Sequence, residues 1–156
     1  MKRATLCFLL KEQSVCLAMK KRGFGVGNWN GSGGKIGDKE GYEKESVTDA
    51  TIREVREELG VTINKLVPRG EIYFEFLHNP EWDAIVYIFT SKNWVGNPTE
   101  SDEMRPQWFN YADIPYDQMW DADRIWLPKV LSGKSVFARF VFNATNRVVR
   151  HSLRTK

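Results

Sequence analysis

Cysteine is scarce in this chain: Cys7 and Cys16 are the only two among 156 residues. Two cysteines are too few for the disulfide framework of a small secreted domain, and their spacing does not match a metal site. We therefore expect two free thiols in a reducing compartment, and a cytoplasmic protein.

Long hydrophobic runs are also missing. The longest uninterrupted apolar run, residues 6–10, has five residues, whereas a membrane-spanning helix needs about 20. The basic start followed by this run has the charge order of a signal peptide, but Lys11 and Glu12 interrupt it and no small-residue cleavage site follows. We expect no membrane segment, and a first β-strand in place of a signal peptide.

The chain also lacks a strong excess of charge of one sign. The net charge is +3, and residues 147–156 hold four bases and no acid, which leaves the rest of the chain at −1. A mildly basic end beside a nearly neutral body is typical of solvated surface, so we expect no polymeric nucleic acid as a partner. The short basic group at residues 20–22 lies next to glycines and suits the phosphates of a small ligand better.

What is present is enough apolar material for a packed core. Apolar residues make up 42% of the chain and aromatic residues 13%. The length is typical of one domain, and neither an internal repeat nor a Pro- or Ser-rich linker divides the sequence. We predict a single domain over residues 1–156, acting as a monomer.

Segments typical of strands and helices follow one another irregularly. A hairpin is predicted from residues 5–10 and 15–19, and further strands at residues 71–77, 84–90, 107–111, 136–142 and 147–153. One helix is predicted from Ser46, its N-cap, to Leu59, with Gly60 as the stop, and another within residues 116–131. Because no regular βαβ alternation occurs, we predict an α+β fold.

Glycine is concentrated in one segment. Residues 23–41 hold eight of the twelve glycines. Glycine weakens helices and strands but permits positive φ and close approach of the backbone to a ligand, so this segment is predicted to be a loop.

Three glutamates share one face of the first predicted helix. At 100° per residue, Glu54, Glu57 and Glu58 lie within an arc of roughly 100°, apart from the apolar stripe. Their mutual repulsion disfavours the helix slightly, and a divalent cation would reverse this. The alternative is a solvated helix face on which Arg53 pairs with Glu57 at i,i+4. Composition alone does not decide between the two.

The residues around this helix resemble a known signature. Glu45, seven intervening residues and then Arg53-Glu54-Val55-x-Glu57-Glu58-x-Gly60-Val61 match the second half of the Nudix hydrolase pattern G-x5-E-x7-R-E-U-x-E-E-x-G-U, where U is aliphatic. The first half departs from the pattern, because ten residues separate Gly34 from Glu45 in place of five. The extra residues fall within residues 37–44, a polar loop that we expect to bulge while the helix stays in place.

The resemblance implies a Nudix fold, in which a mixed curved β-sheet is packed between helices, and a divalent metal centre. Nudix enzymes hold Mg²⁺, for which Mn²⁺ can substitute, against the substrate phosphates and activate a water for attack on phosphorus. By this resemblance the candidate metal ligands are Gly33, Glu54, Glu57, Glu58 and Glu103.

The candidate catalytic residues implied by the resemblance are Arg53, Glu54, Glu57, Glu58 and Glu103. Arg53 is expected to orient Glu45 or a helix glutamate rather than to touch the substrate. Glu103 matches a loop that supplies a further ligand or the base, and its alternative is an acid in an exposed turn.

Within the family, the chain is similar to the MutT-type oxidised purine nucleoside triphosphatases, also called 8-oxo-dGTP diphosphatases, over nearly its whole length. The similarity is carried by residues 19–25, 29–31, 74–76, 100–106 and 119–120. It implies a nucleotide site, and the candidate substrate-binding residues are Thr5, Lys20, Phe24, Asn30, Phe74, Trp120 and Asp123.

Several of these side chains suit a purine. Trp120 is the expected stacking platform with Phe24 and Phe74 as walls, although each of the three is equally suited to the core. Asn30 offers a donor and an acceptor to a base edge, or forms an Asx turn with Gly31.

One of the base-reading acids is replaced. The subgroup carries two adjacent aspartates shortly after the tryptophan, and the matching positions here are Ala122 and Asp123, with residues 126–128 fixing the register. A buried aspartate can donate a hydrogen bond when protonated or accept one when ionised. We expect the loss of one carboxyl to narrow the range of bases or to weaken discrimination between them.

The sequence therefore predicts Mg²⁺-dependent hydrolysis of oxidised purine nucleoside triphosphates, such as 8-oxo-dGTP, to the monophosphate and pyrophosphate, which clears them from the nucleotide pool. One alternative, motivated by Ala122, is a Nudix hydrolase of another purine nucleotide, such as 2-hydroxy-dATP or an alkylated or unmodified dNTP. Another is a nucleotide-binding module that has lost catalysis through the insertion before Glu45.

Overall fold

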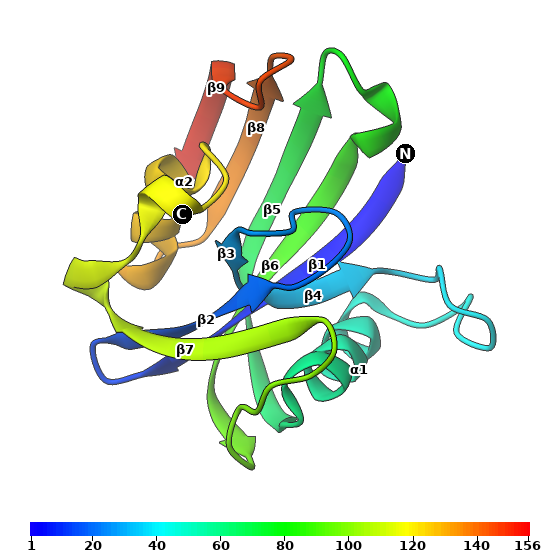
Figure 1. The fold of residues 1–156 in the computed structure, drawn as a ribbon, viewed down its shortest axis with the longest axis vertical. Helices are drawn as coiled ribbons and strands as arrows, with labels where there is room; N and C mark the ends of the chain where they lie inside the picture. The colour runs from blue at the N-terminus through cyan, green and yellow to red at the C-terminus, as the bar shows by residue number, and fades with distance from the viewer.

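One mixed sheet of nine strands organises the chain (Figure 1). The structure is a computed structural model that describes residues 1–156. The strands are β1 (Lys2–Lys11), β2 (Ser14–Lys20), β3 (Trp29–Asn30), β4 (Ser32–Lys35), β5 (Thr62–Phe76), β6 (Ala84–Val95), β7 (Met104–Asn110), β8 (Val136–Phe142) and β9 (Val148–Thr155). The helices are α1 (Val47–Leu59) and α2 (Asp123–Leu131), and short 3-10 turns occupy residues 80–82, 111–113 and 116–118.

The sheet runs in the order β3-β2-β1-β6-β5-β8-β9, with β4 paired to β1 and β7 paired to β2. The pairs β1·β6 and β5·β8 are parallel and the others are antiparallel. Strands and helices therefore mix without a repeated βαβ unit, and the predicted α+β class is confirmed.

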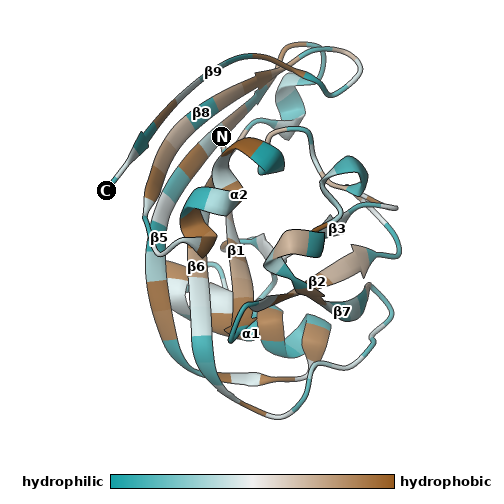
Figure 2. Cartoon of the chain, turned by 90° about the vertical axis from the view of Figure 1, so that its left-hand side faces the viewer, coloured by the Kyte–Doolittle hydropathy of each residue, from teal (hydrophilic) through white to brown (hydrophobic).

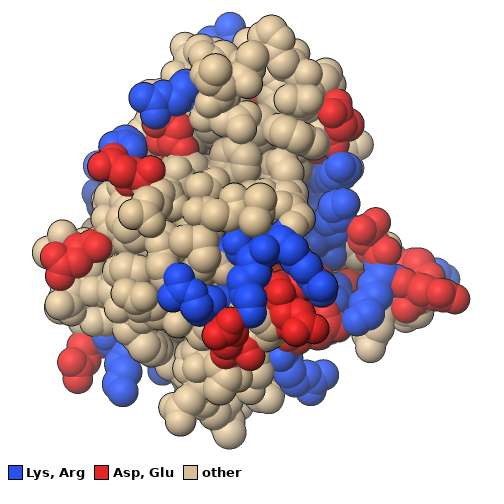
Figure 3. All heavy atoms as spheres, in the orientation of Figure 1, with Lys and Arg blue, Asp and Glu red and all other residues tan.

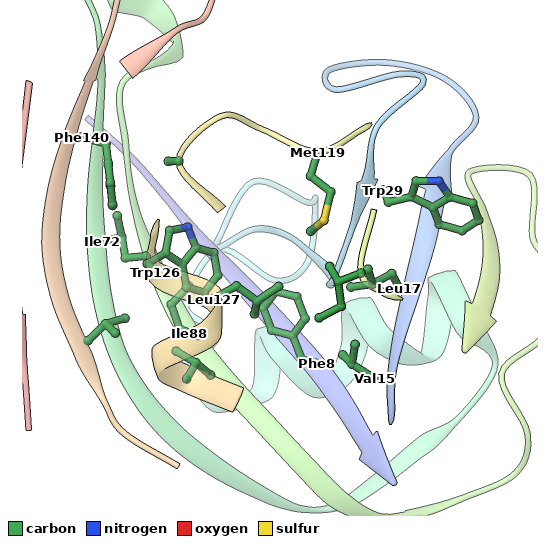
Figure 4. Packing of buried hydrophobic residues seen from close by; sticks show 14 of the residues in the cluster. Phe8, Val15, Leu17, Trp29, Ile72, Ile88, Met119, Trp126, Leu127 and Phe140 are labelled. Carbon is green, nitrogen blue, oxygen red and sulfur yellow. The ribbon is translucent and has the colours of Figure 1, made fainter. Parts of the chain in front are cut away.

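The sheet lies between the two helices because β1 alternates apolar residues to both of its faces. Cys7 and Leu9 pack with residues of α1 in one buried cluster, whereas Phe8 and Leu10 pack with residues of α2 in the other. Figure 4 shows Phe8 beside Trp126 of α2, and the two rings meet edge to face with centroids 5.8 Å apart. Figure 2 shows the long strands curving around α2.

Helix α1 has the predicted ends. The Ser46 side chain accepts a hydrogen bond from the Asp49 backbone N–H, and Gly60 closes the helix at a φ of 73° in the left-handed region. Such caps satisfy backbone groups that the helix leaves free, so they fix where the glutamate-bearing turns begin and end.

Several predicted strand boundaries are wrong, for example those of β1, β6 and β7, which are longer than expected or begin earlier, and two segments differ most. The strand expected at residues 71–77 is β5, which already begins at Thr62, because register shifts around Pro68 and Gly70 keep it in the sheet where the sequence suggested a break. The segment 23–41, predicted to be entirely loop, contains β3 and β4, since its glycines allow β4 to pack against β1.

Both cysteines are free and buried, as expected. No helix of the chain is both long and apolar enough to cross a membrane.

Candidate active site

A cleft of about 1000 Å³ opens between α1, β4, the glycine-rich segment, β5 and the residues before α2. Every residue that the sequence predicted for the site lines this cleft. The lining falls into two groups, one of charged side chains around α1 and one of aromatic side chains.

Glu58 is the most deeply placed of the helix acids. Glu58 is only 4% exposed. Its Oε1 accepts hydrogen bonds from Ser32 Oγ at 2.7 Å and from the Gly33 backbone N–H at 2.9 Å. Burial raises the pKa of Glu58 to about 7, although the two hydrogen bonds and Lys20 oppose the shift.

Glycines in β4 bring the backbone up to these acids. A Cβ on Gly33 would lie 1.9 Å from the Thr5 carbonyl oxygen, and one on Gly34 would lie 2.5 Å from the Glu54 carboxyl carbon. Any larger residue at either position would displace β1 or the Glu54 carboxylate. The side-chain hydroxyl of the same Thr5 pairs with that of Thr51 in α1.

Arg53 contacts Glu45 and two of the helix acids. It is 7% exposed, and its Nη1 donates to Glu54 at 2.9 Å and to Glu57 at 3.3 Å, while Nε and Nη2 donate to Glu45. The Tyr42 ring lies 5.1 Å from its guanidinium carbon. Burial raises the pKa of Glu54 and this pairing with Arg53 lowers it, with burial the larger effect.

Glu57 and Glu103 lie at more open places in the cleft. Glu57 Oε1 pairs with Lys39 Nζ at 2.5 Å. Glu103 lies within 3.6 Å of Lys20 and 3.7 Å of Arg22, and its backbone carbonyl accepts from the Lys21 N–H. The acidic turn is thus tied to the basic residues 20–22. Figure 3 shows acidic and basic side chains intermixed across the lower part of this face and along the projecting loop.

The aromatic group surrounds Trp120. Phe24, 54% exposed, stacks on Trp120 with centroids 5.2 Å apart, and Trp82 meets Phe24 edge to face at 5.0 Å. Phe76 packs edge-on against Trp120 at 5.8 Å, and Phe74 stacks on Phe140 at 6.0 Å. A flat ring that enters this part of the cleft meets apolar faces on several sides.

Two polar side chains face the same space. Asn30 Oδ1 accepts from the adjacent Gly31 N–H at 2.8 Å, a contact to residue i+1 where an Asx turn needs residue i+2, and Asn30 lines the cleft. Asp123 is 3% exposed; Oδ1 accepts from Trp126 Nε1 at 3.1 Å and Oδ2 has no partner. Burial raises the pKa of Asp123 to about 7.

The neighbouring Asp121 does not replace the missing carboxyl. Its Oδ2 accepts from the Val148 N–H at 2.9 Å, and its Oδ1 lies 3.8 Å from Arg124 and 3.6 Å from Arg147. Ala122 is fully buried in the core. Asp123 is therefore the one carboxyl of residues 121–123 that lines the main cleft.

The NUDIX domain family matches residues 1–130 of the chain. The chain belongs to the NUDIX family. It is 43% identical over 150 residues to the oxidized purine nucleoside triphosphate hydrolase of Mus musculus, covering 96% of this chain and 92% of the relative. It is also 43% identical over 152 residues to the protein of the same name from Danio rerio, covering 97% and 94%.

Solved structures show the NUDIX fold directly. The MutT protein from Bacillus halodurans aligns with a TM-score of 0.80 over 98% of this chain and 97% of its own, at 22% identity. A MutT NUDIX hydrolase from Burkholderia pseudomallei aligns with a TM-score of 0.70 over 83% and 97%, at 23% identity. The predicted Nudix fold is confirmed.

The NUDIX helix offers donors that suit a hard divalent cation. Carboxylate oxygens of Glu54, Glu57 and Glu58 all line the cleft. Burial raises the pKa of both Glu54 and Glu58, and neighbouring acids add to each shift, so a cation nearby would stabilise the ionised form of each. No three acidic, His or Cys side chains converge on one point, because Arg53 and Lys39 hold Glu57. The residues of the helix fit such an ion in their chemistry.

The structure also adds lining residues that the sequence analysis missed. Phe76 and Trp82 join the aromatic group, and Lys39 joins the charged group. Phe76 shares a strand face with Phe74, so period-2 alternation was a signal for it. Trp82 lies in the 3-10 turn after β5 and Lys39 in the inserted loop, and neither has a sequence signal.

Proposed function

We propose that this NUDIX chain hydrolyses oxidised purine nucleoside triphosphates to the monophosphate and pyrophosphate, with Mg²⁺ as the cofactor. The observation that carries the proposal is that a single cleft joins the acid-bearing face of α1 to an aromatic group with one buried carboxyl, Asp123. The names of the mouse and zebrafish relatives support the same substrate class.

The base is proposed to bind among Trp120, Phe24 and Phe74. Asp123 Oδ2 and the Asn30 amide then address the polar edge of the purine, where the group that distinguishes an oxidised base lies. Aromatic stacking is worth ~1–3 kcal/mol in single-strand binders, so one platform contributes substantially to nucleotide affinity.

The polyphosphate is proposed to extend toward α1. Lys20 and Arg22 line this part of the cleft and offer cationic groups to phosphate oxygens. Glu54, Glu57 and Glu58 would hold Mg²⁺, with Gly33 and Glu103 as further candidate ligands. When bound, Mg²⁺ supplies the positive charge that polarises the phosphorus and activates a water. Ser32 and the Gly33 N–H fix the Glu58 carboxylate, and Arg53 fixes Glu54.

The test is pyrophosphate release from a panel of modified and ordinary nucleotides at saturating Mg²⁺. We expect kcat/KM for 8-oxo-dGTP to exceed that for dGTP. Equal efficiencies would refute the preference for an oxidised base, and tight binding without turnover would indicate a nucleotide-binding module instead.

A second candidate is hydrolysis of another purine nucleotide, such as 2-hydroxy-dATP. The observation that favours it is the single carboxyl left by Ala122, with Asp121 committed to β9. Asp123 would then be the only one of these carboxyls available to hydrogen-bond any base. The same panel should therefore include 2-hydroxy-dATP and alkylated dNTPs.

We further propose that the protein works in the cytoplasm as a monomer. The two free thiols agree with a reducing compartment.

A further inference from the structure

The loop between β4 and α1 contains the residues that separate this chain from the Nudix spacing, and Figure 1 shows it projecting from the side of the molecule. It is fastened at its base, where the Ile36 N–H donates to the Arg3 carbonyl at 2.9 Å and the Gly37 N–H donates to Glu45 at 3.3 Å. A turn at its centre is closed by the Tyr42 N–H, which donates to the Lys39 carbonyl at 2.9 Å. The loop therefore presents Lys39 and Tyr42 at defined places.

Both of these side chains reach back to the charged group of the cleft. Lys39 Nζ lies 2.5 Å from Glu57 Oε1, and the Tyr42 ring lies under the guanidinium of Arg53 at 5.1 Å. Lys39 Nζ also lies 5.7 Å from the centre of the Tyr42 ring, which keeps the ammonium near Glu57. The Lys39 ammonium group is thus paired with Glu57, one of the three carboxylates of the NUDIX helix.

The ion pair between Lys39 and Glu57 is exposed, so it is weak enough for another cation to replace Lys39. The side chains of Lys39 and Glu57 are 52% and 39% exposed, whereas those of Arg53 and Glu45 are 7% and 5% exposed. Exposed ion pairs are weak and screened by salt, and buried ones are held firmly. Glu57 Oε1 can therefore leave Lys39 while Oε2 keeps its contact with Arg53 Nη1 at 3.3 Å and the Arg53–Glu45 pair stays in place.

We propose that Lys39 is a built-in counter-cation that competes with divalent metal ions for Glu57. In the metal-free chain Lys39 neutralises Glu57 and holds it away from Glu54 and Glu58, and it gives up this carboxylate when the metal binds. Lys39 is a positioning residue, and the inserted loop sets the affinity of the site for free cations. The inference rests on the proposed metal centre.

The test is the affinity of the nucleotide-free protein for Mn²⁺, measured by electron paramagnetic resonance of the free ion. Lys39→Met keeps most of the side-chain length and removes the charge, so we expect Mn²⁺ to bind about two- to fivefold more tightly, with the difference shrinking as salt is added. Lys39→Arg keeps the charge and is expected to stay near the parent affinity.

Lys44→Met is the matched control, because Lys44 lies exposed in the same loop and forms no ion pair. Equal Mn²⁺ affinity for the parent, Lys39→Met and Lys44→Met proteins would overturn the role of Lys39 and leave the metal centre intact. A gain of the same size in Lys44→Met would overturn it too, since the effect would then be one of net charge. No Mn²⁺ binding by any of the proteins would overturn the metal centre and this inference together.

Discussion

Arg53 forms a two-point ion pair with Glu45, from Nε to Oε2 at 2.9 Å and from Nη2 to Oε1 at 2.6 Å. Glu45 stands at the end of the inserted loop and Arg53 in the second turn of α1, so this pair joins the loop to the helix that bears the acids. It lowers the pKa of Glu45 and raises that of Arg53. The pair therefore favours the charged form of both groups.

Replacing Arg53 by Met should therefore destabilise the protein. Removing one partner of a buried pair leaves a carboxylate without compensation, which costs ~3–5 kcal/mol. Urea denaturation measures the loss. The double variant Arg53→Met/Glu45→Met should regain part of it, and a double variant that loses the sum of the two single losses would show that the pair is not coupled.

Glu58→Gln should lower turnover by roughly 100-fold or more while the protein stays folded. Glutamine can still accept from Ser32 and Gly33 but supplies no charge. Steady-state kinetics with 8-oxo-dGTP gives the turnover, and circular dichroism confirms the fold. Glu40→Gln is the control, since Glu40 is exposed in the inserted loop; unchanged turnover in Glu58→Gln would remove Glu58 from the site.

Alanine at Gly33 and at Gly34 should have different effects. At Gly33 the new Cβ meets the backbone of β1 at 1.9 Å, which cannot give way, so the unfolding free energy should fall by a few kcal/mol, the usual range for severe core strain. At Gly34 it meets the Glu54 carboxylate, a movable group, so kcat should fall more than stability. The comparison needs denaturation and kinetics on both variants, and equal stability losses would contradict it.

Asp123→Asn should raise stability more at high pH than at low pH. The folded-state pKa of Asp123 is raised from 3.8 to about 7, so its contribution is fully favourable below 3.8 and is lost as the pH rises through about 7. Asparagine does not ionise, so its advantage over aspartate should grow by on the order of 2 kcal/mol between about pH 5 and pH 8. Thermal denaturation at both pH values measures this, and a gain independent of pH would show that folding does not raise the pKa of Asp123.

Local signals made part of this structure predictable. Ser46 and Gly60 mark the ends of α1, and the spacing of Glu54, Glu57 and Glu58 places them on one face, because caps and helical periodicity depend on nearby residues only. The contacts of Lys39 and Trp82 depend on how distant segments meet, and no spacing in the sequence encodes that. The start of β5 was missed for the same reason, since pairing with β6 from Thr62 onward overrides the local effect of Pro68.

The separate fates of Asp121 and Asp123 show the same limit. They are two residues apart in the sequence. Asp121 is bound to the backbone of β9, whereas Asp123 lines the cleft and has a buried oxygen without a partner. Sequence register identified Asp123 as the base-reading candidate. Only the structure shows that Asp121 is bound to β9 and therefore cannot replace a carboxyl at position 122.

The burial of Cys7 and Cys16 raises the pKa of both thiols to about 12. Peroxide and other electrophiles attack the thiolate, which is almost absent at neutral pH when the pKa is this high. Oxidative stress, the condition that damages purine nucleotides, should therefore modify these two thiols only slowly. Their burial protects the cysteines of the protein under the conditions in which oxidised nucleotides accumulate.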